Sequence, residues 1–122
     1  MDVFLATRLA RLDHRGRIAH RRYLDARDAA FAQMTATAEG RGDRTALIGA
    51  IRTVIVALEE ELGFQLQAAW IVEQEDPAMS ARLQEAAQDT RLRLNLQYSS
   101  FAEDSIYGLT PDDLDELATT PE

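Results

Sequence analysis

The stretch DRTALIGAIRTVIVALEEELGFQLQAAWIVEQE, residues 43–75, contains the densest run of apolar residues in the chain. Its apolar side chains recur at steps of one, three and four residues, the spacing that places them on one wide face of an α-helix. The positions that set this spacing are Leu47, Ile48, Ile51, Val54, Ile55 and Leu58. The stretch therefore predicts a central helix whose apolar face is covered by the rest of the chain.

The sequence gives a clear start for this helix and an ambiguous end. Asp43 can accept hydrogen bonds from free amides of the first turn, which makes it a suitable N-cap. Gly63 followed by Phe64 resembles a helix stop, yet the apolar face continues as far as Trp70. We expect a continuous or kinked helix here, and whether it breaks at Gly63 is left open. The pair Asp76-Pro77 is a cap followed by a first-turn proline, which marks the next helix.

An N-terminal helix is expected over residues 3–37. Apolar or small residues repeat there at alternating steps of four and three, which predicts a narrow helix-packing seam. Its members are Leu5, Leu9, Leu12, Gly16, Ala19, Tyr23, Ala26 and Ala30. The small residues in the middle of the seam would let a partner helix approach closely, and the segment EGRGD at 39–43 supplies the following turn.

A third helix is expected from Pro77 onwards, on the outside of the bundle. The segment RLRLNLQY at 91–98 alternates apolar and polar residues, which is a strand pattern. Leu, Arg, Gln and Asn are poor strand formers, and no second strand is available for pairing, so a helix is favoured while the strand stays open.

The last segment predicts a short C-terminal helix. Thr110 and Pro111 are suited to its cap and first position, and Leu114 and Leu117 are its only large apolar residues. It would be a lid on the bundle or a detachable docking helix. The predicted fold is therefore all-α, a single domain over residues 1–122, arranged as an up-and-down helical bundle of three long helices plus a short C-terminal helix.

Composition excludes several kinds of chemistry. The 122 residues include no cysteine and no lysine, which rules out disulfides, thiolate metal sites and Schiff-base chemistry. Apolar runs are too short for a membrane span, and no secretory signal is evident, so we expect a cytoplasmic protein that does not enter the membrane. No cofactor is expected.

Charge is unevenly distributed along the chain. The net charge is −8, but residues 1–27 carry +4 and the remainder carries −12. The acidic remainder argues against nucleic-acid binding, whereas the basic end could dock on an acidic surface of a partner or of the protein itself.

Part of the basic end forms an arginine stripe along the first helix. Its members, which fall within about 60° of one another at 100° per residue, are Arg8, Arg11, Arg15 and Arg22. Glutamates of the central helix are the candidate partners for these guanidinium groups, within or between subunits. They are Glu59, Glu60 and Glu61.

Signatures of catalysis are incomplete. Glu73 and Asp76 match half of the acidic pattern of helical metal-dependent nucleotide hydrolases, but the other half is missing. His14 and His20 are six residues apart, hence about 120° from alignment, and cannot chelate together on one straight helix. We expect both histidines on the surface, no metal site and no catalytic residue, and the hydrolase is the least favoured hypothesis.

The only tryptophan, Trp70, has two interpretations. A single tryptophan near a helix end usually plugs the core with its indole edge at the rim. The alternative is a pocket for a small molecule, lined by aromatic and sulfur-containing side chains. Its candidate members are Tyr23, Phe31, Met34, Phe64 and Trp70.

These observations favour a non-enzymatic protein-protein interaction module: an adaptor, regulator or assembly component, including one of phage origin. It would act through helix-helix contacts, with a second copy of itself as the first partner to consider. The predicted anchors are Leu5, Leu9, Leu12 and the arginine stripe. The alternative is a small-molecule-sensing regulatory domain with its pocket near Trp70. Sequence leaves open the partner or ligand, the oligomeric state, and a host or phage role.

Overall fold

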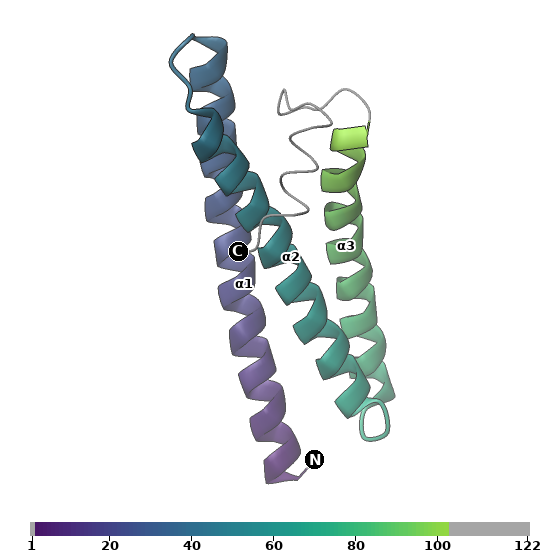
Figure 1. Cartoon of the computed structure of the whole chain (residues 1–122). Coiled ribbons are helices and arrows are strands. Elements are labelled where there is room, and N and C mark those ends of the chain that lie inside the picture. Colours follow the sequence, from purple (N-terminus) through teal and green to yellow (C-terminus); the bar gives the residue numbers. More distant parts are fainter. Residues whose placement is uncertain (1, 103–122) are drawn as a thin grey trace.

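The computed structural model describes residues 2–102, which form three α-helices and no strand within that range. They are α1 (Val3–Ala38), α2 (Arg44–Val72) and α3 (Pro77–Ala102). α2 runs between the other two helices, and each turn reverses the direction of the chain (Figure 1). The all-α prediction is confirmed. The predicted helix after Thr110 lies outside the described residues.

α1 is a single helix of 36 residues. Its N-cap, which the sequence analysis did not identify, is Asp2, whose Oδ1 accepts from the amide of Leu5 at 2.8 Å. The helix passes through Gly16 without a break, and a Cβ at this position would lie only 3.9 Å from the Cβ of Phe64 on α2. α1 and α2 therefore approach each other closely here, as the small-residue seam predicts.

The turn between α1 and α2 uses the glycines that the sequence supplies. Gly40 has φ of +79°, a conformation that side-chain-bearing residues rarely adopt. The amide of Arg41 donates to the carbonyl of Ala36 at 2.8 Å and so satisfies one of the last carbonyls of α1. Asp43 then caps α2, with its Oδ1 accepting from the amide of Thr45 at 2.9 Å.

α2 continues through Gly63 to Val72 without a break. Its buried face runs past the glycine, because Leu58 before it and Ala68 and Val72 after it are all buried. The burial of this face outweighs the cost of about 1 kcal/mol that a glycine adds inside a helix.

α3 begins as predicted at Asp76-Pro77, where Asp76 Oδ1 accepts from the amide of Met79 at 3.0 Å. It includes the alternating segment 91–98, so the helix interpretation of that segment is confirmed. Thr90 is buried and Leu94 is partly buried against the core, and the four positions from one to the other make about one helical turn. This packing explains why the segment is a helix although its sequence alternates like a strand.

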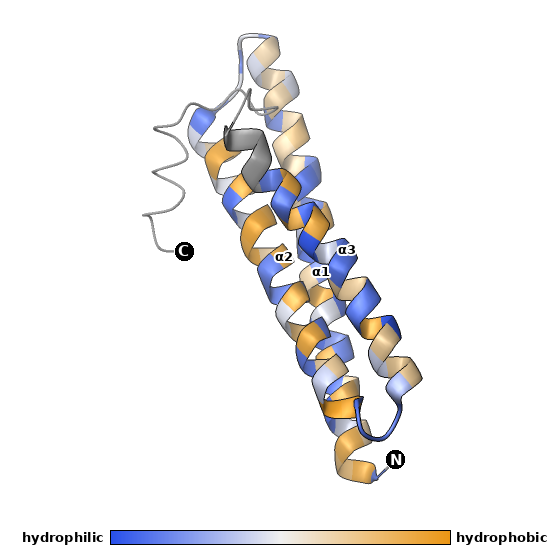
Figure 2. Ribbon diagram, turned by 90° about the vertical axis from the view of Figure 1, so that its right-hand side faces the viewer, coloured by the Kyte–Doolittle hydropathy of each residue, from blue (hydrophilic) through white to orange (hydrophobic). Residues whose placement is uncertain are grey.

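The core lies mainly between α1 and α2. Its buried members at the centre of the pair are Ala19, Tyr23, Ala26, Ala30, Ile51, Val54, Ala57 and Leu58. Apolar and hydrophilic residues alternate along all three helices in Figure 2. α3 is tied to α2 by Ser80, whose hydroxyl donates to the carbonyl of Ala69 at 2.8 Å.

α3 packs on α2 and not on the backbone of α1. Among the described residues, no Cα atom of α1 lies within 8 Å of a Cα atom of α3. α3 lies on the outside of the α1–α2 pair, and the side between α1 and α3 is open. No described helix is both long and apolar enough to cross a bilayer.

Candidate functional site

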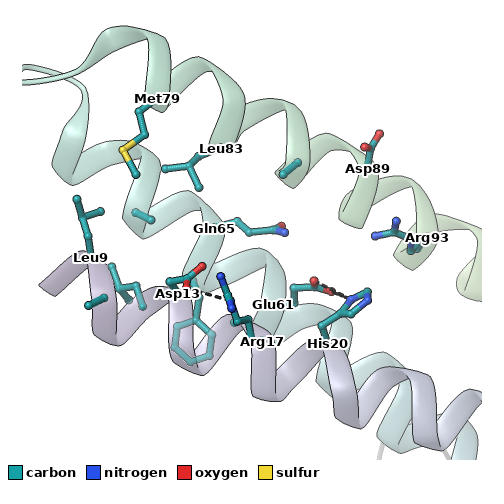
Figure 3. A pocket seen from close by; sticks show the side chains of 16 residues that line it. Leu9, Asp13, Arg17, His20, Glu61, Gln65, Met79, Leu83, Asp89 and Arg93 are labelled. Atoms are coloured by element: carbon teal, nitrogen blue, oxygen red, sulfur yellow. Dashed lines mark hydrogen bonds and ion pairs between the residues drawn. The ribbon is translucent and has the colours of Figure 1, made fainter. Parts of the chain in front are cut away.

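A groove runs between α1 and α3, with α2 as its floor (Figure 3). Its volume is about 630 Å³, and all three helices contribute side chains to it. The groove exists because α1 and α3 are both packed on α2 but are separated from each other. We name it the α1–α3 groove.

One end of the groove is apolar. Leu9 of α1, Phe64 and Ala68 of α2, and Met79 and Leu83 of α3 line this end. Leu9 and Ala68 are buried and pack together with Val72, while Met79 and Leu83 are partly buried against the same cluster. Met79 and Leu83 of α3 therefore keep part of their apolar surface exposed in the groove.

The other end of the groove contains a paired histidine and glutamate. His20 Nδ1 lies 3.0 Å from Oε2 and 3.2 Å from Oε1 of Glu61. The glutamate side chain is only 9% exposed, whereas that of His20 is 41% exposed. A carboxylate so far from water needs a hydrogen-bond donor, and His20 is the donor that the structure provides. His14 is exposed, as expected, and His20 is partly exposed while its ring contacts the buried carboxylate of Glu61.

A second polar contact fixes α2 against α3 in the floor of the groove. The hydroxyl of Thr90 donates to Gln65 Oε1 at 2.7 Å, and Thr90 is fully buried. The Ala86 carbonyl also lies 3.2 Å from this hydroxyl. Gln65 is thereby held in the floor between the apolar and polar ends, because its side-chain oxygen is committed to α3.

The remaining charges of the groove come from its two walls. On α1, Asp13 and Arg17 form an ion pair with a distance of 3.0 Å. On α3, Asp89 and Arg93 line the groove one turn apart, at the same end as the His20–Glu61 pair (Figure 3). Within residues 2–102 no ion pair joins Asp89 or Arg93 to an opposite charge. These two groups could therefore pair with charges on a bound molecule.

The arginine stripe meets the central glutamates at one point. Arg22 pairs with Glu60 at 3.0 Å, and both side chains are partly exposed. Glu61 faces His20 instead of an arginine, and Glu59 is exposed. Arg8, Arg11 and Arg15 are exposed, and no carboxylate of the described residues lies within ion-pair distance of them. Among the described residues of one chain, Arg22 alone of the four arginines pairs with a glutamate of the central helix.

The predicted leucine anchors are used within the chain. Leu9 is buried, and Leu5 and Leu12 are partly buried against the cluster of Leu9, Ala68 and Val72. A substitution at Leu9 would therefore damage the fold before it tested self-association.

The five residues of the predicted ligand pocket do not line one cavity. Tyr23 and Met34 pack in the α1–α2 core, Phe31 is 48% exposed, and Phe64 lines the α1–α3 groove. Trp70 is 73% exposed, so the expectation that it plugs the core is wrong. The reason is helical geometry, because its neighbours Ala69 and Val72 occupy the buried positions of α2.

Trp70 instead borders a shallow hollow of about 250 Å³ between α2 and α3, which it shares with Leu66 and Arg91. Within residues 2–102, no three His, Asp or Glu side chains are placed together in a way that could hold a metal ion.

Several groove residues were missed by the sequence analysis, notably Gln65, Ala86, Asp89 and Arg93. The apolar steps of α3 were visible, but nothing in the sequence says which side of α3 faces α1. The only available signal was the spacing of Met79, Leu83 and Ala86, which marks a second stripe beside the one that packs on α2.

Comparison with protein-family models, with curated proteins and with solved structures finds no match to this chain.

Proposed function

We propose that this protein is a non-enzymatic interaction module that binds an amphipathic helix of a protein partner in the α1–α3 groove. The observation that carries the proposal is the separation of α1 from α3 above α2. A bundle with one side open offers the surface on which a further helix packs, and helix-in-groove binding is a common mode of peptide recognition.

The dimensions of the groove support a helix as the ligand. Arg93 lies fourteen positions after Met79 on α3, which corresponds to about 21 Å along a helix axis. About four turns of a partner helix would fill this length. Leu9, Met79 and Leu83 would contact its apolar side chains at one end, and Asp89 and Arg93 would pair with its charged side chains at the other.

A second copy of the chain is the first partner to test. Large apolar side chains remain exposed on all three helices, and such side chains are candidates for contacts between copies. They are Val3, Phe4, Ile18, Phe31, Leu66, Trp70, Leu92 and Leu96. We propose accordingly a cytoplasmic adaptor, regulator or assembly component, of host or phage origin, in which three long helices and a short C-terminal helix form one domain over residues 1–122.

The direct test is copurification of the native complex with determination of its mass, repeated with a blocked groove. Ala86 lines the groove on α3, whereas Ala81 on the same helix is exposed and outside it. Ala86→Trp should abolish copurification of the partner, or the dimer mass, while Ala81→Trp should retain it. A complex that survives Ala86→Trp unchanged would show that the partner binds elsewhere.

A small-molecule-sensing role is the second candidate, favoured by the size and lining of the groove. Its volume of about 630 Å³ falls within the range of about 300–1,000 Å³ typical of small-ligand sites, and an apolar end is combined with a few polar groups. A ligand screen followed by NMR of the His20 ring would detect binding there. A ligand that stabilises Ala86→Trp as strongly as the unmodified protein would not occupy the groove.

A further inference from the structure

Three polar side chains of the α1–α3 groove have nitrogen atoms without a partner among the described residues. Gln65 uses its side-chain oxygen towards Thr90, and its side-chain NH₂ group makes no hydrogen bond within residues 2–102. Arg93 is partly buried and makes neither a hydrogen bond nor an ion pair there. His20 uses Nδ1 towards Glu61, which leaves Nε2 of a ring that lines the groove.

The carboxylates of the groove, in contrast, are engaged or turned outwards. Asp13 is paired with Arg17 at 3.0 Å, and Glu61 with His20 at the same distance. Asp89 is exposed, and its carboxylate points away from His20 in Figure 3. The groups that remain for a ligand inside the groove are therefore mainly hydrogen-bond donors, and a complementary ligand must bring acceptors.

A carboxylate matches these nitrogen atoms. Its two oxygens accept up to about four hydrogen bonds, and the guanidinium group of Arg93 can donate two of them in parallel. The ring of His20, placed between Glu61 and a second carboxylate, would carry a proton on both nitrogen atoms and donate on both sides. A cationic head group would be repelled by Arg93 and would leave the Gln65 amide without an acceptor.

The apolar end of the groove adds a second requirement. Leu9 and Phe64 line this end, and Met79 and Leu83 are only partly buried there. Leu83 lies ten positions before Arg93, which is about 15 Å along α3. A ligand that reaches from the donors to this end therefore needs a hydrocarbon chain behind its carboxylate.

We infer that the α1–α3 groove binds a carboxylic acid with a long hydrocarbon chain. Gln65, His20 and Arg93 hold the carboxylate, and the chain lies along the apolar end. The inference rests on the small-molecule role proposed for the groove and specifies the chemical class of the ligand. Such a ligand competes with a partner helix for the same surface, so its binding regulates the proposed interaction.

Calorimetric titration of the full chain with decanoate tests the inference. We expect one molecule to bind per chain, with an affinity roughly tenfold higher than that of octanoate, because two further CH₂ groups leave water. Decanol and decyltrimethylammonium share the hydrocarbon chain but have a neutral and a cationic head group, and both should bind about tenfold more weakly or worse. Equal or tighter binding of either compound would overturn the inference.

Substitutions on α3 locate the carboxylate. Arg93→Gln should weaken decanoate binding about tenfold, whereas Arg91→Gln, outside the α1–α3 groove, should leave it unchanged. Asp89→Asn removes a negative charge and should not weaken binding. Ala86→Trp should abolish binding and Ala81→Trp should retain it, with circular dichroism verifying the fold of each variant. An equal loss in Arg93→Gln and Arg91→Gln, or binding that survives Ala86→Trp, would place decanoate elsewhere and contradict the inference.

The inference and the proposed interaction can fail separately. If decanoate does not bind while Ala86→Trp abolishes copurification of the partner, the groove binds a helix and not the acid. If decanoate binds as described while no partner copurifies, the ligand class stands and the interaction module fails. Where both bind, decanoate should displace the partner, and a ternary complex would overturn the shared site.

Discussion

The two sides of α1 show opposite solutions to helix packing. Towards α2, α1 presents small residues such as Ala19 and Ala30, and the opposing Ile51 and Leu58 are fully shielded from water. Towards α3, the backbones do not meet, and a groove of about 630 Å³ remains. α1 and α2 are therefore closely packed along their shared face, whereas α1 and α3 leave a groove between them.

Residue size and charge explain this difference. On the α1–α2 side, alanine on one helix faces a branched side chain on the other, so both can interlock at close distance. On the α1–α3 side, charged Asp13, Arg17, Asp89 and Arg93 project from both walls. Complete burial of these charges would be costly, which keeps the walls apart.

The largest expected effect is the loss of a core side chain on the closed side. Leu58 is 0% exposed at the centre of the α1–α2 core. Leu58→Ala should lower the free energy of unfolding by about 2–5 kcal/mol, because it leaves a cavity in tightly packed surroundings. Urea denaturation measures this loss. The matched control is Leu92→Ala on α3, where the side chain is 61% exposed and the change should be below about 0.5 kcal/mol.

An added side chain tests the close approach of α1 and α2. Ala30 is 0% exposed against Leu47 and Ile51, so Ala30→Leu should destabilise the fold by about 1–3 kcal/mol through overpacking. Its neighbour Ala29 is exposed, and Ala29→Leu should be tolerated. Equal melting temperatures for the two variants would contradict the tight packing of this interface.

The contact of His20 with the buried Glu61 should matter more than the partly exposed pair of Arg22 and Glu60. His20→Ala leaves the Glu61 carboxylate without its donor and should cost on the order of 1 kcal/mol in unfolding free energy. Arg22→Ala breaks the partly exposed pair with Glu60 and should cost less. A double-mutant cycle of His20→Ala with Glu61→Gln measures the interaction energy of the two side chains. A coupling energy of zero would show that their contact does not stabilise the fold.

The smallest effect is expected for the arginine stripe. Replacing Arg8, Arg11 and Arg15 together by Gln should change the unfolding free energy by less than about 0.5 kcal/mol per site, because these side chains are exposed and make no ion pair with a described residue. Melting curves at low and high salt provide the measurement. A large, salt-dependent loss would show that the stripe is paired after all, with another part of the chain or with a second copy.

Local features of the fold were predictable from the sequence. Asp43 and Asp76 could be recognised as caps because a cap depends on neighbours within three residues. The apolar spacing on both sides of Gly63 limited α2 to a continuous or kinked helix, and the structure shows it continuous. The seam of α1 also gave the correct interface, since its period is a property of one helix.

Features that depend on the arrangement of helices were not predictable. The burial of Trp70 was misjudged because α2 has two neighbours, and their positions decide which residues of α2 are covered. The pairing of Glu61 with His20 instead of an arginine depends on the register between α1 and α2. The groove itself depends on the distance between two helices that are not consecutive in the chain.

The position of α2 between its neighbours also has a consequence for local unfolding. Among the described residues, the backbone of α3 approaches that of α2 and not that of α1, so we expect α3 to detach as a separate cooperative unit while the α1–α2 hairpin keeps its core. Native-state hydrogen exchange should then show weaker protection across α3 than at Ile51 or Leu58. The width of the groove would be set by how firmly α3 is held, through Ser80 and Thr90, to a single supporting helix.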